Sequence, residues 1–401
     1  MFAKRILLAL IITGTMATVA GAQSQEGDYP FEVNQATDSG RVSPSGKSMQ
    51  AKVIKVNCSA GKKIANALSK ADPGDTIRVT GTCHERVTII TDRITLDGQG
   101  SAILDGGGSQ PITAFLGVIT VDGARGIAVT GFTIRNGPVG IVAKRGAAIA
   151  VSNVTVQENG VGIVVADHSF AELTNVTSQR NQTVGMDVFT SSTAVLKGTI
   201  NITENAGNGV EVNGNSVLEI RGATVQINND NEFGLIAASG SQVALFGFDE
   251  SQGSTLTANG NGVAGIGLGD TTLTVFASNT TISAENNPMG IFLPDGGSIS
   301  SPFGRGTFLI KNNGIGLNFG QGSGANIVGG LNVQNNGTGL LADAAGILTL
   351  VSMPPNPSSI TGNTDADVNL RFGTRSTING VTIGTITCDG TVLSRGTIVC
   401  P

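Results

Sequence analysis

The sequence predicts an all-β fold: a right-handed parallel β-helix with three short strands per coil and an N-terminal capping helix. Three observations lead to this prediction. A glycine-marked segment recurs along the chain, apolar and polar residues alternate within each unit, and helix-forming residues are sparse. Glycine accounts for 58 of the 401 residues, and charged residues for only 13%. Such a composition suits many short strands joined by tight turns.

A segment that begins with glycine and continues with apolar residues marks each repeat. Successive glycines are 22 to 31 residues apart. A helical repeat would show a period of about 3.6 residues inside each unit, whereas these units alternate with a period of two. The repeat glycines are Gly140, Gly162, Gly185, Gly209, Gly234, Gly265, Gly290, Gly316 and Gly339.

Residues 148–166 illustrate one unit, with three pairs of inward-pointing apolar residues separated by turns. Asparagine recurs before the glycine strand at Asn136, Asn159, Asn181 and Asn205. An asparagine tolerates left-handed backbone, and its amide can bond to the asparagine one coil away. Coils are therefore expected about 4.8 Å apart, with polar residues outward. A two-sheet sandwich is the alternative, but its strands would lack the constant period.

Both ends of such a stack need protection. Residues 61–71 carry apolar residues at helical spacing and predict the capping helix, followed by a first strand at residues 76–79. Residues 382–401 predict a C-terminal cap. The four cysteines lie at the two ends, and the favoured pairs are Cys58 with Cys83 and Cys388 with Cys400, although three connectivities are possible.

The first residues predict export. Residues 1–22 have a basic start, an apolar run and a small-residue cleavage site, as in a secretory signal peptide. Residues 23–50 predict a flexible leader, and residues 51–401 the β-helix domain. No later segment is apolar enough to span a membrane, and a net charge of −5 argues against nucleic-acid binding. The protein is expected to be a secreted, periplasmic or cell-surface monomer.

Residues 58–106 resemble the opening of pectate-lyase-like right-handed β-helix proteins. The matching elements are the helix, then Pro73-Gly74-Asp75-Thr76-Ile77, Gly81-Thr82-Cys83-His84-Glu85 and Ile94-Thr95-Leu96-Asp97-Gly98. The coils over about residues 119–345 look like the repeats of the same superfamily. The resemblance implies this fold and an extracellular polysaccharide as partner. It implies no catalytic residues, because neither the acidic ligand set of the lyases nor the aspartate group of the hydrolases has a match here.

The repeat also predicts which outward residues lie above one another. The position two after each glycine holds Val142, Val164, Asp187, Glu211 and Ile236 on successive coils. Asp187 and Glu211 should therefore be about 5 Å apart. Two carboxylates that close either raise the pKa of one of them or recruit a cation.

Charged and polar residues gather on these same coils and form the predicted site. Asp187 and Glu211 are the candidate catalytic carboxylates of a hydrolase, or the candidate ligands of Ca²⁺. Lys144 and Arg145 are the candidate bases of a lyase. The candidate substrate-binding residues are Asp167, His168, Phe189 and Asn213. The plainer interpretation is that any exposed strand face carries polar residues.

Two functions are compatible with the sequence. The first is an exported protein that binds and cleaves an extracellular, acidic polysaccharide as a lyase or hydrolase. The second is a non-catalytic surface, adhesion or matrix protein that uses the stack as a scaffold. The fold does not decide between them, because this architecture hosts enzymes and passive proteins alike.

Overall fold

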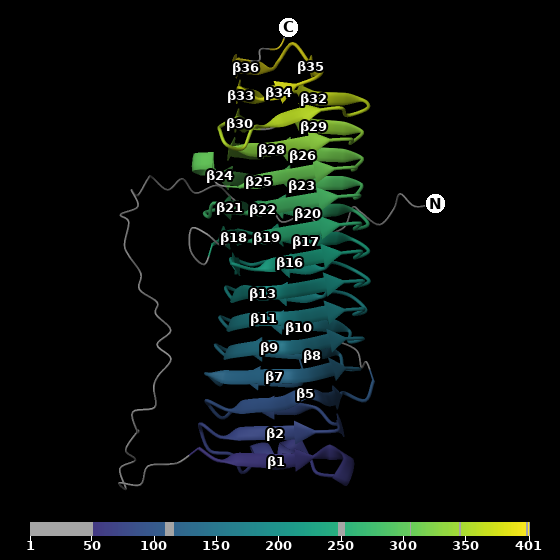
Figure 1. The fold of residues 1–401 in the computed structure, drawn as a ribbon, viewed down its shortest axis with the longest axis vertical. Coiled ribbons are helices and arrows are strands. Elements are labelled where there is room, and N and C mark those ends of the chain that lie inside the picture. The colour runs from purple at the N-terminus through teal and green to yellow at the C-terminus, as the bar shows by residue number, and fades with distance from the viewer. Residues whose placement is uncertain are drawn as a thin grey trace, which may run out of the picture. The chain divides into compact units, whose positions relative to one another are not determined.

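The computed structural model describes residues 51–108, 116–247, 253–304, 306–344 and 346–397, together with Cys400. The predicted signal peptide and leader lie outside these residues. Residues 51–401 form one compact unit of stacked parallel coils (Figure 1). No helix among the described residues is long and apolar enough to cross a membrane.

Two parallel sheets make up the walls of the stack. One sheet has a single strand from each coil, and 13 strands in all. These strands are β4 (Val87–Ile89), β6 (Gly117–Asp122), β8 (Val139–Lys144), β10 (Val161–Val165), β12 (Met186–Val188), β14 (Val210–Val212), β17 (Phe233–Ala238), β20 (Ala264–Gly269), β23 (Met289–Asp295), β26 (Ile315–Gln321), β29 (Thr338–Asp343), β32 (Ala366–Arg371) and β35 (Ile386–Cys388).

The second sheet has 23 strands and supplies the remaining sides of the coils. Its strands are β1 (Val53–Asn57), β2 (Thr76–Thr80), β3 (Thr82–His84), β5 (Thr95–Asp105), β7 (Ile127–Arg135), β9 (Ala148–Gln157), β11 (Phe170–Gln179), β13 (Thr193–Thr203), β15 (Val217–Arg221), β16 (Thr224–Asn228), β18 (Gln242–Phe246), β19 (Thr255–Asn259), β21 (Thr272–Val275), β22 (Thr281–Glu285), β24 (Ser298–Ser301), β25 (Thr307–Lys311), β27 (Gly324–Val328), β28 (Gly330–Gln334), β30 (Ile347–Val351), β31 (Ser359–Thr361), β33 (Arg375–Asn379), β34 (Thr382–Ile383) and β36 (Leu393–Gly396).

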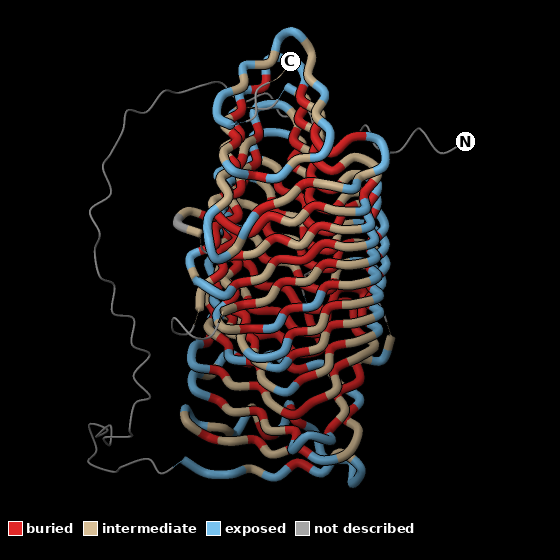
Figure 2. The backbone as a smooth tube through the Cα atoms, turned by 45° about the horizontal axis from the view of Figure 1, so that its top comes forward, coloured by how far each residue is buried: buried red, intermediate tan, exposed pale blue. Residues whose placement is uncertain are grey.

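The core lies inside the coils. Inward residues of consecutive coils pair directly, as Val151 with Leu173 and Leu173 with Leu196 do across β9, β11 and β13. All three are at most 1% exposed. Figure 2 shows the same alternation along the whole tube, with buried positions repeating from coil to coil. The apolar alternation read from the sequence is therefore the core pattern.

The prediction of three separate strands per coil does not hold throughout. In the early coils, two of the three expected strands merge into one long strand: β7, β9, β11 and β13 are such strands. The chain bends within them at residues such as Asn153 and Asn175, which have φ near 54°. From β14 onward, Gly222 and Ala223 break the long strand, and the coil has three strands. An asparagine in the left-handed region bends a strand without ending it, so the sequence pattern alone does not separate the two cases.

The repeat glycines are required by close approach between coils. A Cβ on Gly185 would lie 2.6 Å from the carbonyl oxygen of Gly209, and a Cβ on Gly234 would lie 2.7 Å from that of Gly265. The same Cβ atoms would each lie 2.7 Å from a side-chain amide nitrogen, that of Asn205 or Asn261. No larger residue fits without moving the backbone.

The amide nitrogens beside these glycines belong to a buried ladder of side chains. Each ladder residue after the first accepts, at Oδ1, a hydrogen bond from the backbone N–H of the ladder residue one coil before it; the Asn287 N–H to Asn313 Oδ1 distance is 3.0 Å. The first, Asn159, accepts from the N–H of Gly137. The members are Asn159, Asn181, Asn205, Asp230, Asn261, Asn287, Asn313, Asn336 and Asn363. The predicted ladder is therefore present, and it runs much further along the stack than the four asparagines named above.

Two details of the predicted ladder are wrong. The left-handed residue of each turn precedes the ladder residue and need not be asparagine, since Glu158, Arg180 and Glu204 occupy it. Asn136 stands at this preceding position, with φ of 56°, and its amide donates to Asp105 instead. The turn requires a residue with left-handed backbone conformation, and the ladder requires a side-chain amide. These two requirements are met by adjacent residues.

The N-terminal end differs from the prediction in length and order. The helix α1 covers only Ile64–Leu68, after the 3-10 turn η1 (Cys58–Ala60), because the backbone at Lys63 is extended. Ile64 is fully buried, and the Glu85 carboxylate accepts hydrogen bonds from the first N–H groups of the helix. β1 precedes the helix and pairs with β2, so residues 76–79 are not the first strand.

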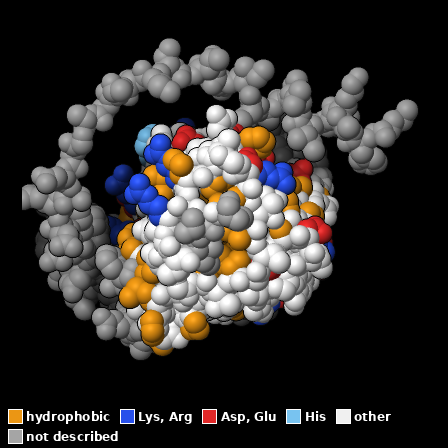
Figure 3. Space-filling model, turned by 90° about the horizontal axis from the view of Figure 1, so that it is seen from above, with side chains coloured by type: hydrophobic (Ala, Val, Ile, Leu, Met, Phe, Trp, Pro, Cys, Tyr) orange, Lys and Arg blue, Asp and Glu red, His pale blue; other side chains and the backbone are white. Residues whose placement is uncertain are grey.

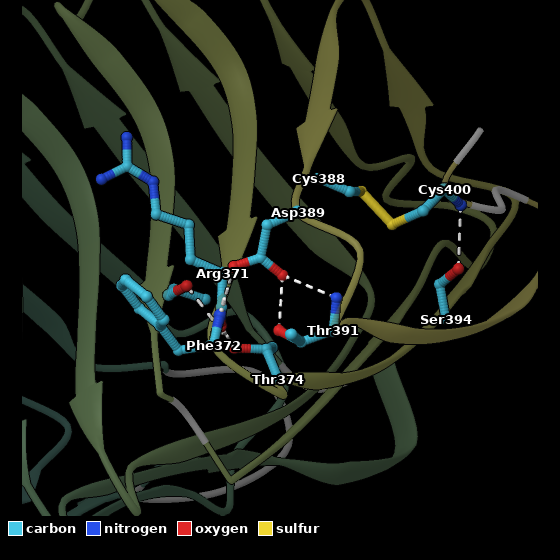
Figure 4. The surroundings of a disulfide bond; sticks show 9 residues. Arg371, Phe372, Thr374, Cys388, Asp389, Thr391, Ser394 and Cys400 are labelled. Atoms are coloured by element: carbon cyan, nitrogen blue, oxygen red, sulfur yellow. Dashed lines mark hydrogen bonds between the residues drawn. A yellow bond between two sulfur atoms is a disulfide. The ribbon is translucent and has the colours of Figure 1, made fainter.

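Both disulfides pair as predicted, Cys58 with Cys83 and Cys388 with Cys400. At the C-terminal end, the N–H of Cys400 donates to Ser394, and Asp389 accepts from the backbone of Phe372 and Thr391 (Figure 4). Figure 3 looks onto this end of the stack, where hydrophobic and basic side chains reach the surface. The last coils end in the strands β34, β35 and β36 and a disulfide, with no helical cap among the described residues. The 3-10 turn η2 (Pro302–Gly304) lies several coils earlier, between β24 and β25.

Candidate functional site

The outer face of the 13-stranded sheet carries the row of residues that the repeat predicts. Strand pairing aligns Val142 with Val164, Val164 with Asp187, and Asp187 with Glu211. The alignment continues from Glu211 to Ile236 and beyond. Asp187 on β12 and Glu211 on β14 are thus direct neighbours, one coil apart, on the same face. The expected adjacency of the two carboxyl groups is confirmed.

Asp187 lies in a partly desolvated position. Its side chain is half-buried, and its Oδ1 atom has no hydrogen-bond partner. Burial raises the pKa of this carboxyl group to about 7, and the negative charge of Glu211 adds to the effect. Near neutral pH the side chain is therefore divided between a protonated acid, which can give up a proton, and a carboxylate.

An outward apolar cluster accounts for much of this burial. Val139, Val142, Val161, Val164 and Ala166 form a group outside the main core, and Phe189 and Val184 pack against it. Val142 and Val164 are at most 1% exposed, although both point away from the coil interior. Asp187 is the next residue in the same row, so one side of its carboxyl group meets apolar surface instead of water.

Glu211 is held by a neighbouring amide. Asn208 donates a hydrogen bond from Nδ2 to Glu211 Oε1, and its own Oδ1 accepts the N–H of Phe233 at 2.9 Å. Asn208 is 8% exposed and is fixed by this pair of contacts. The arrangement directs Glu211 as a hydrogen-bond acceptor beside Asp187. An acid and an acceptor one coil apart are the minimal components for proton transfer.

Lys144 and Arg145 are not part of this pair. Both lie at the end of β8 and face Asp122, with Lys144 Nζ 4.0 Å from Asp122 Oδ2 and Arg145 in an ion pair with the same carboxylate. The strand pairing places Asp122 directly beside Lys144. β8 is two coils from β12, which is roughly 10 Å along the stack. Asp122 was not predicted as a site residue, although it stands at the same repeat position as Lys144.

The four candidate substrate-binding residues lie along the edge where these strands end. Asp167 and His168 are exposed turn residues with φ of 55° and 60°. Phe189 and Asn213 are half-buried and follow β12 and β14 by one residue. Phe189 packs on the outward apolar cluster, so only part of its ring is open to a ligand.

The carboxyl pair does not match a dedicated calcium site. Calcium takes six to eight oxygen ligands. Among the described residues, the one group of three or more potential ligand side chains comprises Cys58, Cys83 and Glu85, and its cysteines form a disulfide. Asp187 and Glu211 offer two carboxylates, and the nearby Asn208 amide is already engaged on both atoms. We therefore derive no chemistry through a bound metal.

A second surface feature was not predicted. An open trough of about 660 Å³ lies over β24, β27 and β30 on the other sheet, where Ser300, Asn326 and Thr349 align on consecutive coils. On earlier coils of the same sheet, Phe246 and Phe276 stack with ring centroids 4.8 Å apart, and Arg221 lies 5.2 Å from the Phe246 centroid. Ser300, Asn326 and Thr349 share one offset from the repeat glycines of their coils, so the repeat could have indicated this row, whereas Phe246 and Phe276 do not share an offset.

One protein family matches part of the chain. The family described as "Right handed beta helix region" matches residues 76–248. No curated protein matches the sequence.

Three similar solved structures illustrate the likeness. An alginate lyase from Paenibacillus sp. str. FPU-7 is 14% identical, with a TM-score of 0.39 over 60% of this chain and 97% of that one. The A-module of a mannuronan C-5 epimerase from Azotobacter vinelandii is 11% identical, with a TM-score of 0.44 over 84% and 91%. A pectin methylesterase from Erwinia chrysanthemi is 15% identical, with a TM-score of 0.29 over 59% and 80%. With its stacked parallel coils and this family match, the chain is a right-handed parallel β-helix protein.

Proposed function

We propose that this is an exported β-helix protein that binds an extracellular polysaccharide on the outer face of the 13-stranded sheet and hydrolyses a glycosidic bond there. The observation that carries the proposal is the pairing of Asp187 with Glu211 on adjacent coils, with the pKa of Asp187 raised to about 7. Two disulfides support export, because such bonds persist in oxidising compartments.

In this proposal Asp187 is the general acid. Its protonated carboxyl group gives a proton to the glycosidic oxygen as the bond from that oxygen to the anomeric carbon breaks. The Glu211 carboxylate attacks the anomeric carbon and forms a glycosyl ester. Water then releases the sugar, and Asp187, now ionised, takes the proton of that water. Strands lie about 4.8 Å apart, close to the roughly 5 Å separation of carboxyl groups in hydrolases that retain the anomeric configuration.

Hydrolysis has more support than a lyase reaction. A lyase would need Lys144 or Arg145 to remove a proton beside the sugar carboxylate. Both side chains face Asp122 and are two coils away from Asp187. Asp167, His168, Phe189 and Asn213 are proposed to contact the sugars on either side of the cleaved bond, because they follow the ends of β10, β12 and β14.

The alternative is a non-catalytic surface, adhesion or matrix protein. The trough over β24, β27 and β30 favours it, since serine, threonine and asparagine side chains lie there among glycines and apolar residues, on a different sheet from Asp187. Hydroxyl and amide groups can hydrogen-bond to a glycan without cleaving it. Binding there would leave Asp187 without a role in function.

The test is a screen of the purified protein against neutral and acidic polysaccharides, with calcium and with chelator, scored for new reducing ends and for unsaturated products. New reducing ends without unsaturation, equal in calcium and chelator, support hydrolysis. Unsaturated products would instead indicate a lyase.

The variants Asp187→Asn and Glu211→Gln should abolish product formation, whereas Asp295→Asn, on β23 of the same sheet, is the matched control and should not. Cleavage unchanged in Asp187→Asn contradicts the site, and glycan binding without cleavage supports the alternative.

A further inference from the structure

The buried ladder contains one member that is not an asparagine. Asp230 lies between Asn205 and Asn261, is 1% exposed, and keeps the bonds that an asparagine oxygen would make. Its Oδ1 accepts from Asn205 N at 2.8 Å and from Asn205 Nδ2 at 2.9 Å. Its own N–H donates to Asn261 Oδ1 at 3.1 Å. Half of the Asp230 side chain therefore fits the ladder without change.

The other half of the side chain does not fit as a carboxylate. Elsewhere in the ladder, Nδ2 donates twice: Asn287 Nδ2 lies 3.2 Å from Asn313 Oδ1 and 3.0 Å from the carbonyl oxygen of Ala258. Asn313 Nδ2 repeats the pattern, with its own bonds to the next ladder oxygen and to the carbonyl oxygen of Ala284. A ladder position thus presents two acceptors to the second polar atom of its side chain.

At Asp230 this second polar atom is an oxygen. Oδ2 is buried and has no hydrogen-bond partner. It occupies the place of the amide nitrogen: a Cβ on Gly209 would meet Asp230 Oδ2, just as one on Gly185 would meet Asn205 Nδ2. An ionised Asp230 would therefore direct a buried negative oxygen at acceptors that have no hydrogen to offer.

We propose that Asp230 is held as a protonated carboxylic acid in the folded protein, donates a hydrogen bond from Oδ2 within the ladder, and makes the stack a pH-sensitive structure that weakens when this proton is lost. The electrostatic surroundings agree. The pKa of Asp230 is raised to about 7, chiefly by burial; the Asn205 hydrogen bonds lower it in part, and the negative charge of Glu204 adds to the rise.

The charged groups around Asp230 give no cation to offset its charge. On its own turn the charged residue is Glu232, and on the turn one coil before it is Glu204. Residues 259–263, on the coil after it, carry no charge. Glu204 lies 3.8 Å from Arg180, and Arg180 also pairs with Glu158, so this basic group is already engaged by two carboxylates.

The direction of the pH effect follows from linkage. Because the folded pKa lies above that of the unfolded chain, the contribution of this group is fully favourable below the ordinary aspartate value of about 3.9. It is lost progressively as the pH rises from there to about 7. Asp230→Asn restores the missing donor and carries no charge, so its advantage over the natural protein should be absent near pH 4. It should grow by up to roughly tenfold in folding equilibrium constant per pH unit until about pH 7.

The experiment is urea unfolding of the oxidised full chain at pH 4, 5, 6, 7 and 8, comparing the natural protein with Asp230→Asn and with the converse variant Asn287→Asp. The difference between the first two should rise with pH and then level off. Asn287→Asp should show the opposite, with stability close to the natural protein at pH 4 and a loss that grows with pH. Glu204→Gln is the control for simple charge repulsion and should recover only a small part of the effect.

Two results would overturn the proposal. One is an Asp230→Asn advantage that is equal at every pH, and the other is an Asp230→Asn variant less stable than the natural protein at pH 7. If Asn287→Asp does not fold at any pH, the Asp230→Asn series alone decides. A carboxylic-acid carbonyl band in the infrared spectrum at pH 6, reduced in Asp230→Asn, provides a second readout that does not depend on unfolding.

Discussion

Asp187 and Asp230 have the same electrostatic perturbation in two different places. Burial raises the pKa of each to about 7, and each has one buried oxygen without a hydrogen-bond partner. Asp187 stands on the outer face, half-buried, beside a second carboxyl group. Asp230 is part of the wall between coils, 1% exposed and bound on both sides by ladder neighbours. A raised pKa thus identifies an unusual environment, and only the access of other molecules to the carboxyl group separates a candidate catalyst from a structural acid.

The largest expected contrast is in activity. Asp187→Asn should lower glycan hydrolysis by at least roughly 100-fold, the usual contribution of a general acid, whereas Asp230→Asn should leave the rate unchanged. Initial rates on whichever polysaccharide the screen identifies measure both. A loss of rate in Asp230→Asn with folding intact would remove the distinction drawn between the two residues.

The second contrast is in stability, where Asp230→Asn should have a larger effect than Asp187→Asn. At pH 7.5, Asp230→Asn should raise the free energy of unfolding by on the order of 2 to 4 kcal/mol, from the shift of its pKa to about 7. Asp187→Asn should also stabilise, but by less, because water still reaches its half-buried carboxyl group. Parallel urea titrations at pH 4.5 and pH 7.5 give both values. Equal gains for the two variants would contradict the difference in burial.

A third prediction concerns the partner of Asp187. Glu211→Gln removes the negative charge that is the smaller of the two causes raising the pKa of Asp187. That pKa should fall, yet remain above its ordinary value, because burial persists. Nuclear magnetic resonance titration of the Asp187 carboxyl carbon follows this shift directly, without requiring activity. No movement at all would indicate that the two side chains do not interact.

The smallest effect is expected at the basic residues. Arg145→Ala breaks an exposed ion pair with Asp122 and should change the free energy of unfolding by less than about 1 kcal/mol. It should not alter the rate of hydrolysis if Asp187 and Glu211 act without it. A loss of rate comparable to that of Asp187→Asn would place Arg145 in the site.

Much of the fold could be predicted because the repeat converts positions far apart in the chain into neighbours. A glycine that tolerates no Cβ and an asparagine that bonds to its counterpart recur at matched offsets, so the register of Asp187 against Glu211 follows from spacing alone. The disulfide pairs were favoured because each joins two cysteines near one end of the chain, and the structure has these pairs out of the three possible connectivities. The capping helix was predicted, but its short length and the continuous strands β7, β9, β11 and β13 were not, because they depend on single backbone angles at Lys63 and at asparagines such as Asn153.

The sequence by itself determined the stack, the vertical rows and the adjacency of the two carboxyl groups, because a regular period leaves the chain little choice of register. Only the tertiary structure decided which outward residues lose contact with water. Val142 and Val164 point outward and are nevertheless buried, Lys144 and Arg145 turn to Asp122, and Asp230 takes an asparagine's place. Desolvation depends on side chains that several coils bring together, and that information is spread over the chain rather than contained in any one repeat.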